Sequence, residues 1–356
     1  MAALCGVASC AAQFSALAEG TLVLFNWADY FPPDLLDKFE TETGIHVVTE
    51  IYQSNEDLLD KLRSASGHYD VVVPSDYMVE ILIEEGLLQP VDAARMPNFA
   101  HVRAPFDDPW FDPARVYSVP NMNGTSGFMY DPRQVVGGLL EESWSEFFAP
   151  RPEIAGKIVA LDDQYEMYRA AAYYAGVNPC TENPTEAQHI LDVLQAQKPK
   201  LAFYTSGTNP NVPDSLQDGI DLVTSGSVAI LQIWDGGARL MQRSVPEMIY
   251  VVPKEGSAWW QDAYAVPSDA WNPENAKIFL NWIMQPENIA AVSNFTGYTN
   301  AIAGSEAFMD EAVARDQLEG VAPAKRDRLR PVEPCSPAAR ELSDKVWARL
   351  WPRTVK

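Results

Sequence analysis

Short apolar runs alternate with segments of helical periodicity along the first part of the chain. Runs rich in β-branched residues predict buried strands at 21–25, 45–48 and 69–73. Helical spacing of apolar residues, each time closed by a glycine, predicts helices at 33–43, 54–66 and 77–85. Strands that are apolar on both faces and separated by helices are typical of a parallel, doubly wound sheet.

The same alternation returns in the second part of the chain. It predicts strands at 157–161, 228–231, 249–252 and 263–266, and helices at 186–197 and 273–284. The fold class is therefore α/β, with two doubly wound α/β lobes. Ligands of such sheets bind at the carboxyl ends of the strands, so we expect a ligand cleft between the lobes.

Acidic residues outnumber basic ones, with 49 Asp and Glu against 26 Lys and Arg and a formal net charge of −23. A surface this negative repels phosphate backbones and anionic lipids, which disfavours nucleic-acid and membrane-surface binding and favours cationic small molecules. The 10 Trp, 14 Tyr and 14 Phe also exclude a chain that stays unfolded.

Motifs for catalysis are absent from the sequence. No phosphate-binding glycine loop and no Gly-x-Ser-x-Gly nucleophile motif occurs, and the four histidines are scattered without metal-ligand spacing. We therefore expect a binding protein with no cofactor and no bound metal, not an enzyme. Adjacent Tyr173 and Tyr174 leave one alternative, a ferric-ion receptor, although two packed aromatics on a helix are the preferred explanation for them.

Aromatic residues and acids occur together near several predicted strand ends. These segments are 26–30, 75–77, 162–166, 233–235 and 259–262, with Tyr298 in a further loop. Carboxylates form charge-assisted hydrogen bonds with ammonium groups, and aromatic faces attract cations while packing against methylene groups. This mixture predicts a site for a flexible ligand that carries several ammonium groups.

Four stretches resemble a known family, the spermidine/putrescine-binding proteins of bacterial ABC importers (PotD and PotF type). They are residues 25–30 (FNWADY), 39–44 (FETETG), 69–75 (YDVVVPS) and Gly297 with Tyr298. The resemblance implies a periplasmic binding protein type II fold, a periplasmic location, and a monomer that delivers a polyamine to the permease subunits of a membrane transporter. It also implies a first lobe of residues 19–126 plus 263–307 and a second lobe of residues 127–262 plus 308–356.

The resemblance further implies the ligand-binding residues. The aromatic set is Trp27, Tyr30, Tyr77, Trp234, Trp260 and Tyr298, and the acidic set is Asp29, Asp163, Glu166 and Asp262. Ala28 replaces a hydroxyl residue usual in the family, and a polar contact expected near 333–335 has no clear counterpart.

Ligand choice follows from the acids of the second lobe. Asp163 and Glu166 offer two amine positions, and Tyr77 with Trp260 gives a long aromatic wall, so we expect spermidine to be preferred to putrescine. The alternative for Asp163 is that it only caps the following helix. A periplasmic polyamine sensor that acts on a membrane signalling protein would share the same pocket.

Residues 1–18 lack charge and end in Ala-Leu-Ala, which predicts a signal peptide. A lipid-attachment motif at Cys10 is the competing interpretation. If the leader removes Cys5 and Cys10, then Cys180 and Cys335 remain in an oxidising compartment, where they either pair or stay free.

Overall fold

The computed structural model describes residues 20–64, 68–205 and 216–351. The predicted signal peptide and Cys10 lie outside the described residues. Within the described part of the chain, no helix is long and apolar enough to span a bilayer.

Strands and helices alternate as the apolar pattern predicts. The strands are β1 (Gly20–Trp27), β2 (Ile45–Tyr52), β3 (Val71–Val72), β4 (Ser118–Tyr130), β5 (Ile158–Leu161), β6 (Phe203–Thr205), β7 (Ile230–Trp234), β8 (Ile249–Val251), β9 (Ser257–Ala265), β10 (Thr299–Asn300) and β11 (Leu329–Pro331). The helices are α1 (Pro33–Thr43), α2 (Asn55–Ser64), α3 (Asp76–Glu84), α4 (Ser145–Phe148), α5 (Gln164–Ala175), α6 (Pro184–Gln197), α7 (Leu216–Thr224), α8 (Asp235–Ser244), α9 (Pro273–Ile283), α10 (Pro286–Thr296), α11 (Glu311–Glu319) and α12 (Pro337–Leu350).

Helix α1 illustrates how local sequence sets these bounds. Pro33 stands at the first helical position, where its missing N–H costs nothing. Gly44 ends the helix with φ 77°, a left-handed conformation that suits glycine, and its N–H donates to the Glu40 carbonyl. The chain can therefore turn directly into β2.

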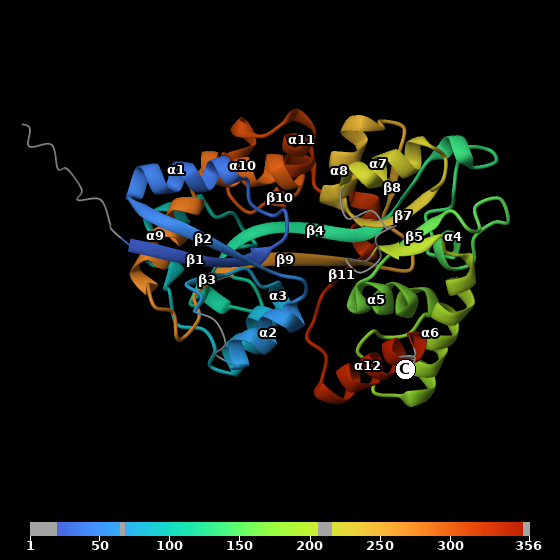
Figure 1. The fold of residues 1–356 in the computed structure, drawn as a ribbon, viewed down its shortest axis with the longest axis horizontal. Coiled ribbons are helices and arrows are strands. Elements are labelled where there is room, and N and C mark those ends of the chain that lie inside the picture. The colour runs from blue at the N-terminus through green and yellow to red at the C-terminus, as the bar shows by residue number, and fades with distance from the viewer. Residues whose placement is uncertain (1–19, 65–67, 206–215, 352–356) are drawn as a thin grey trace, which may run out of the picture.

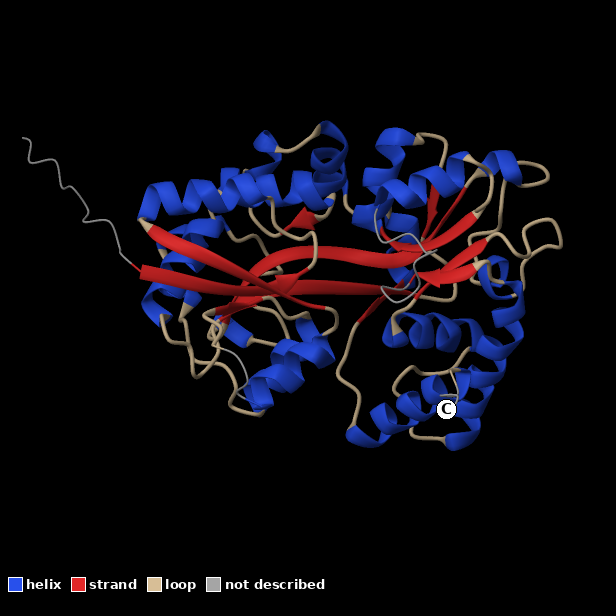
Figure 2. Cartoon of the chain, in the orientation of Figure 1, coloured by secondary structure: helices blue, strands red, loops and turns tan. Residues whose placement is uncertain are grey.

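The described strands form one continuous sheet with the order β2-β1-β3-β9-β4-β7-β5-β6. Parallel pairing holds β1 to β2 and β3 at one end of the sheet, and β5 to β6 and β7 at the other. Long β4 and β9 run antiparallel between these two halves and join them (Figure 1). Helices lie on both sides of the sheet in each half of the molecule (Figure 2).

The α/β fold class is confirmed, but the expectation of strand 263–266 is corrected. Strand β9 begins at Ser257, so Trp259 to Asp262 lie within it and not before it. Strand β4 was not predicted at all, because its sequence SVPNMNGTSGFMY contains proline, glycine and polar residues that interrupt the apolar pattern. Pairing with β9 on one side and β7 on the other compensates for that weak local preference.

Apolar clusters lie on both sides of this crossing. One contains Leu24, Phe39, Phe279 and Met122, and another contains Phe128 and the helices near it. Strand β4 thus leaves one core and enters the next between Met122 and Phe128, close to the predicted lobe boundary at 126. The division into lobes stays a prediction, and α11, assigned there to the second lobe, packs against β10 and residues 305–308.

Cys180 and Cys335 form a disulfide, as one of the two interpretations of the sequence held. It joins the loop after α5 to the loop before α12, and α12 packs against α5 and α6. The bond closes a loop with a sequence separation of 155 residues. Closing so long a loop removes much conformational entropy from the unfolded chain.

We therefore expect the double variant Cys180→Ser, Cys335→Ser to lower the free energy of unfolding by about 2–4 kcal/mol. Urea denaturation followed by circular dichroism measures the change. Dithiothreitol should destabilise the wild-type protein and leave the double variant unaffected. Equal stability of the two oxidised proteins would contradict a stabilising role.

Candidate ligand-binding site

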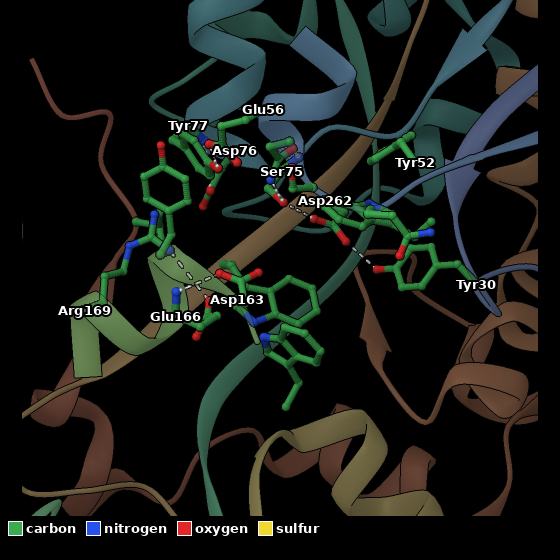
Figure 3. A pocket seen from close by; sticks show the side chains of 18 of the residues that line it. Tyr30, Tyr52, Glu56, Ser75, Asp76, Tyr77, Asp163, Glu166, Arg169 and Asp262 are labelled. Atoms are coloured by element: carbon green, nitrogen blue, oxygen red, sulfur yellow. Dashed lines mark hydrogen bonds and ion pairs between the residues drawn. The ribbon is translucent and has the colours of Figure 1, made fainter. Parts of the chain in front are cut away.

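A cavity of about 260 Å³ lies where the carboxyl ends of β1, β2, β3, β5 and β7 approach β9 (Figure 3). Nine of the ten predicted site residues line it. They are Trp27, Tyr30, Tyr77, Asp163, Glu166, Trp234, Trp260, Asp262 and Tyr298. Segments far apart in the chain therefore converge on one cavity, as expected for the carboxyl ends of strands.

Asp29 does not line the cavity. Its backbone is left-handed with φ 50°, and its side chain is exposed in the turn between β1 and α1. The turn directs its neighbours Ala28 and Tyr30 to the cavity instead. Its role in ligand binding stays a prediction that this geometry does not support.

Asp262 on β9 anchors one end of the cavity. The Tyr30 hydroxyl donates to one carboxylate oxygen at 2.5 Å, and the Ser75 hydroxyl donates to the other at 2.8 Å. Burial raises the pKa of Asp262 to about 6, although the two hydrogen bonds act in the opposite direction. An ionised carboxylate at this position is therefore short of counter-charge.

Aromatic rings surround this end. Trp27 lies beside Tyr52 because β1 and β2 pair in parallel with these two residues in register, and the ring centroids are 4.6 Å apart. The Trp27 indole and the Tyr52 hydroxyl both donate to the Val73 carbonyl. The Trp260 and Tyr298 rings meet edge to face at 4.9 Å. These hydrogen bonds and ring contacts fix the rings as an apolar wall with polar edges.

Glycines allow the close approach of the two halves of the site. A Cβ atom at Gly124 on β4 would lie 2.6 Å from the Trp260 ring, inside van der Waals contact. A Cβ atom at Gly236 would overlap the Tyr298 ring in the same way. Only the absence of a side chain at these positions lets both aromatic residues reach their places.

The other end of the cavity is the beginning of α5. Asp163 is the N-cap of this helix, since its carboxylate accepts from the Glu166 N–H at 2.9 Å. Asp163 thus caps α5 and also lines the cavity, so a contact between its carboxylate and an amine stays a prediction. Glu166 is buried, and this burial raises its pKa against the opposing influence of Arg169.

Two further acids line the cavity that the sequence did not single out. Glu56 at the beginning of α2 accepts from the Tyr77 hydroxyl at 2.9 Å. Asp76 at the beginning of α3 is fully buried and accepts from the Tyr77 and Gln261 N–H groups. Burial raises the pKa of both carboxyls. Asp76 stands between Ser75 and Tyr77 in a segment that the sequence marked, so its position was a usable signal.

The remaining contacts complete the comparison with the sequence. Val332 lines the cavity close to 333–335, so the C-terminal segment contributes an apolar contact there. Tyr174 stacks on Phe148 with ring centroids 5.3 Å apart, against the apolar cluster of the second half. Among the described residues, no group of three His, Cys, Asp or Glu side chains is placed to hold a metal ion.

Curated relatives share most of the chain. The spermidine/putrescine-binding periplasmic protein of Escherichia coli K12 is 31% identical over 305 residues, covering 84% of this chain and 82% of its own length. The putrescine-binding periplasmic protein SpuD of Pseudomonas aeruginosa UCBPP-PA14 is 31% identical over 319 residues, covering 86% and 85%.

Solved structures share the fold. A structure from Listeria monocytogenes described as a spermidine/putrescine ABC transporter superposes with a TM-score of 0.81 at 26% identity, covering 93% of this chain and 98% of that one. The PotD lipoprotein of Treponema pallidum, at 24% identity, gives a TM-score of 0.77. The family of bacterial extracellular solute-binding proteins matches residues 34–319. The chain belongs to this family, with the α/β architecture of type II periplasmic binding proteins.

Proposed function

We propose that this protein is a periplasmic receptor that binds a polyamine in the cavity and delivers it to the permease of an ABC importer. One observation carries the proposal. Among the described residues, five acids and one arginine line the cavity together with several aromatic side chains. Two or three ammonium groups on a flexible apolar chain match that arrangement in charge and in shape.

The electrostatics of the acids support a cationic ligand. Burial raises the pKa values of Glu56, Asp76, Glu166 and Asp262, so the ionised forms are disfavoured as the site stands. A bound ammonium group would reverse that balance by supplying counter-charge in a place of low dielectric. Relatives named for spermidine and putrescine support the same ligand class.

We predict that the protein binds spermidine more tightly than putrescine. The basis of this prediction is that Asp163 and Glu166 provide two amine positions. The structure adds Arg169, whose guanidinium lies 3.6 Å from the Glu166 carboxylate, whereas Asp163 caps α5 by accepting from the Glu166 N–H. Binding as a monomer and docking on permease subunits are part of the same proposal.

Calorimetric titration of the ligand-stripped protein with putrescine, cadaverine and spermidine tests the function. We expect dissociation constants near micromolar, equivalent to about −8 kcal/mol, with spermidine the tightest. Lysine, whose carboxylate would meet the acids of the cavity, should bind much more weakly. No binding of any polyamine would overturn the proposal, and tighter binding of putrescine would overturn the ranking only.

Asp262→Asn keeps the shape of the side chain and removes its charge. Leaving a buried ammonium group without its partner costs roughly 3–5 kcal/mol, so we expect affinity for spermidine to fall about 100-fold or more. The matched control is Asp269→Asn, which removes the same charge from an exposed position outside the cavity. Equal affinities of the two variants would show that Asp262 is not a ligand contact.

The same substitution should stabilise the protein in the absence of ligand. Asp262 has a pKa of about 6 when folded, against about 3.9 for an unfolded aspartate. Well below pH 4 the carboxyl is protonated in both states and costs nothing. Between about pH 4 and pH 6 it is ionised in the unfolded state but still largely protonated in the folded state, so by pH 7 the folded state has lost about 2–3 kcal/mol relative to the unfolded state.

Urea unfolding at pH 4 and pH 7 checks this sign. The stability of Asp262→Asn relative to wild type should rise by about 2–3 kcal/mol between the two pH values. A difference that does not change with pH would show that the buried carboxylate is not destabilising.

A further inference from the structure

In the part of the chain that the structure describes, Arg169 is the one basic residue that lines the cavity. It lies on α5, one turn after Glu166, with its guanidinium 3.6 Å from the Glu166 carboxylate. The same group stands over the Tyr77 ring at 5.4 Å and faces the Tyr165 ring at 5.9 Å. Its side chain is 14% exposed.

These surroundings are those of a bound cation. A carboxylate supplies counter-charge and two aromatic faces supply cation–π attraction, which is the combination that the cavity offers to ammonium groups elsewhere. Burial alone would lower the pKa of Arg169, but Glu166 and Tyr77 outweigh it and raise the pKa, so the group stays charged. The protein's own side chain therefore fills a cation position.

That position is at one end of the cavity. Figure 3 shows Arg169 beside Tyr77 and Glu166, on the side opposite to Tyr30 and Asp262. A ligand anchored by an ammonium group at Asp262 would extend toward α5. The far ammonium of a long ligand would then meet Asp163 and Glu56, with the guanidinium close by as a like charge.

We propose that Arg169 is a specificity-determining residue that occupies the cation position at the α5 end of the cavity. Its charge lowers the affinity for long polyamines relative to that for short ones. This inference rests on the proposed function, because it concerns the same site. The ranking of ligands is then a balance between the acids, which favour a third charge, and Arg169, which opposes it.

The test compares wild type with Arg169→Gln and Arg169→Lys by calorimetry, using putrescine, spermidine and 1,8-diaminooctane. The last ligand has the same number of chain atoms between its terminal nitrogens as spermidine but lacks the middle charge. In Arg169→Gln, the affinity for spermidine relative to that for putrescine should rise about tenfold. The affinity for 1,8-diaminooctane relative to that for putrescine should rise by a similar factor. Arg169→Lys keeps the charge and should retain the wild-type ratio.

Arg151→Gln is the matched control, because Arg151 pairs with Glu146 at 2.8 Å outside the cavity. Its ligand ratio should equal that of wild type. Should Arg169→Gln fail to fold by circular dichroism, Arg169→Met keeps the apolar stem against the tyrosine rings and carries the same expected result.

The outcomes separate cleanly. An unchanged ratio, or an equal loss of affinity for all three ligands, would show that Arg169 only holds α5 in place and would overturn the inference. If affinity relative to putrescine rises for spermidine but not for 1,8-diaminooctane, the inference is also overturned. The guanidinium would then act on the middle amine of spermidine and not on its terminal amine. If wild type binds no polyamine, the proposed function fails instead.

Discussion

Several carboxylates are withdrawn from water in one cavity, and the rest of the site depends on what compensates them. Ionised groups in a low dielectric need charge or hydrogen bonds from their surroundings. The hydroxyls of Tyr30 and Ser75 satisfy Asp262 geometrically, yet they bring no positive charge. The sheet holds such acids within reach of one another because β1, β2, β3, β5 and β7 end at the cavity and β9 passes beside it.

The two antiparallel strands in the middle of the sheet determine how these ends meet. Asp262 and Trp260 lie on β9, and Gly124 lies opposite Trp260 on β4. On the other side, Arg239 of α8 donates to Asp235 and Asp316 and also to the Gly297 carbonyl. This arginine links the helix after β7 to the loop of Tyr298, so the aromatic wall is built across both halves of the molecule.

Much of this was predictable, for identifiable reasons. Strands that are buried on both faces are recognisable in the sequence as apolar runs. Residues at the carboxyl ends of such strands lie at the sheet edge, and Trp27, Tyr77 and Trp234 indeed line the cavity there. Strand β4 escaped detection because its stability comes from pairing and not from its own sequence. The left-handed backbone conformation that turns the Asp29 side chain outward could not be predicted from the residue types in this segment.

Arg169 could not be found by the same means, because a helical arginine most often faces solvent, and Tyr77, over which its guanidinium stands, comes from another helix. Comparison with other buried acids shows why its place matters. Asp235, Glu146 and Asp131 each have an arginine partner close to them in the chain, as expected for acids that serve the fold. Asp70 is satisfied by backbone and amide N–H groups. Asp262 has neither a cation nor an N–H donor among the described residues, whereas Glu166 has its guanidinium. The protein thus supplies counter-charge to Glu166 at one end of the cavity and leaves that of Asp262, at the other end, to the ligand.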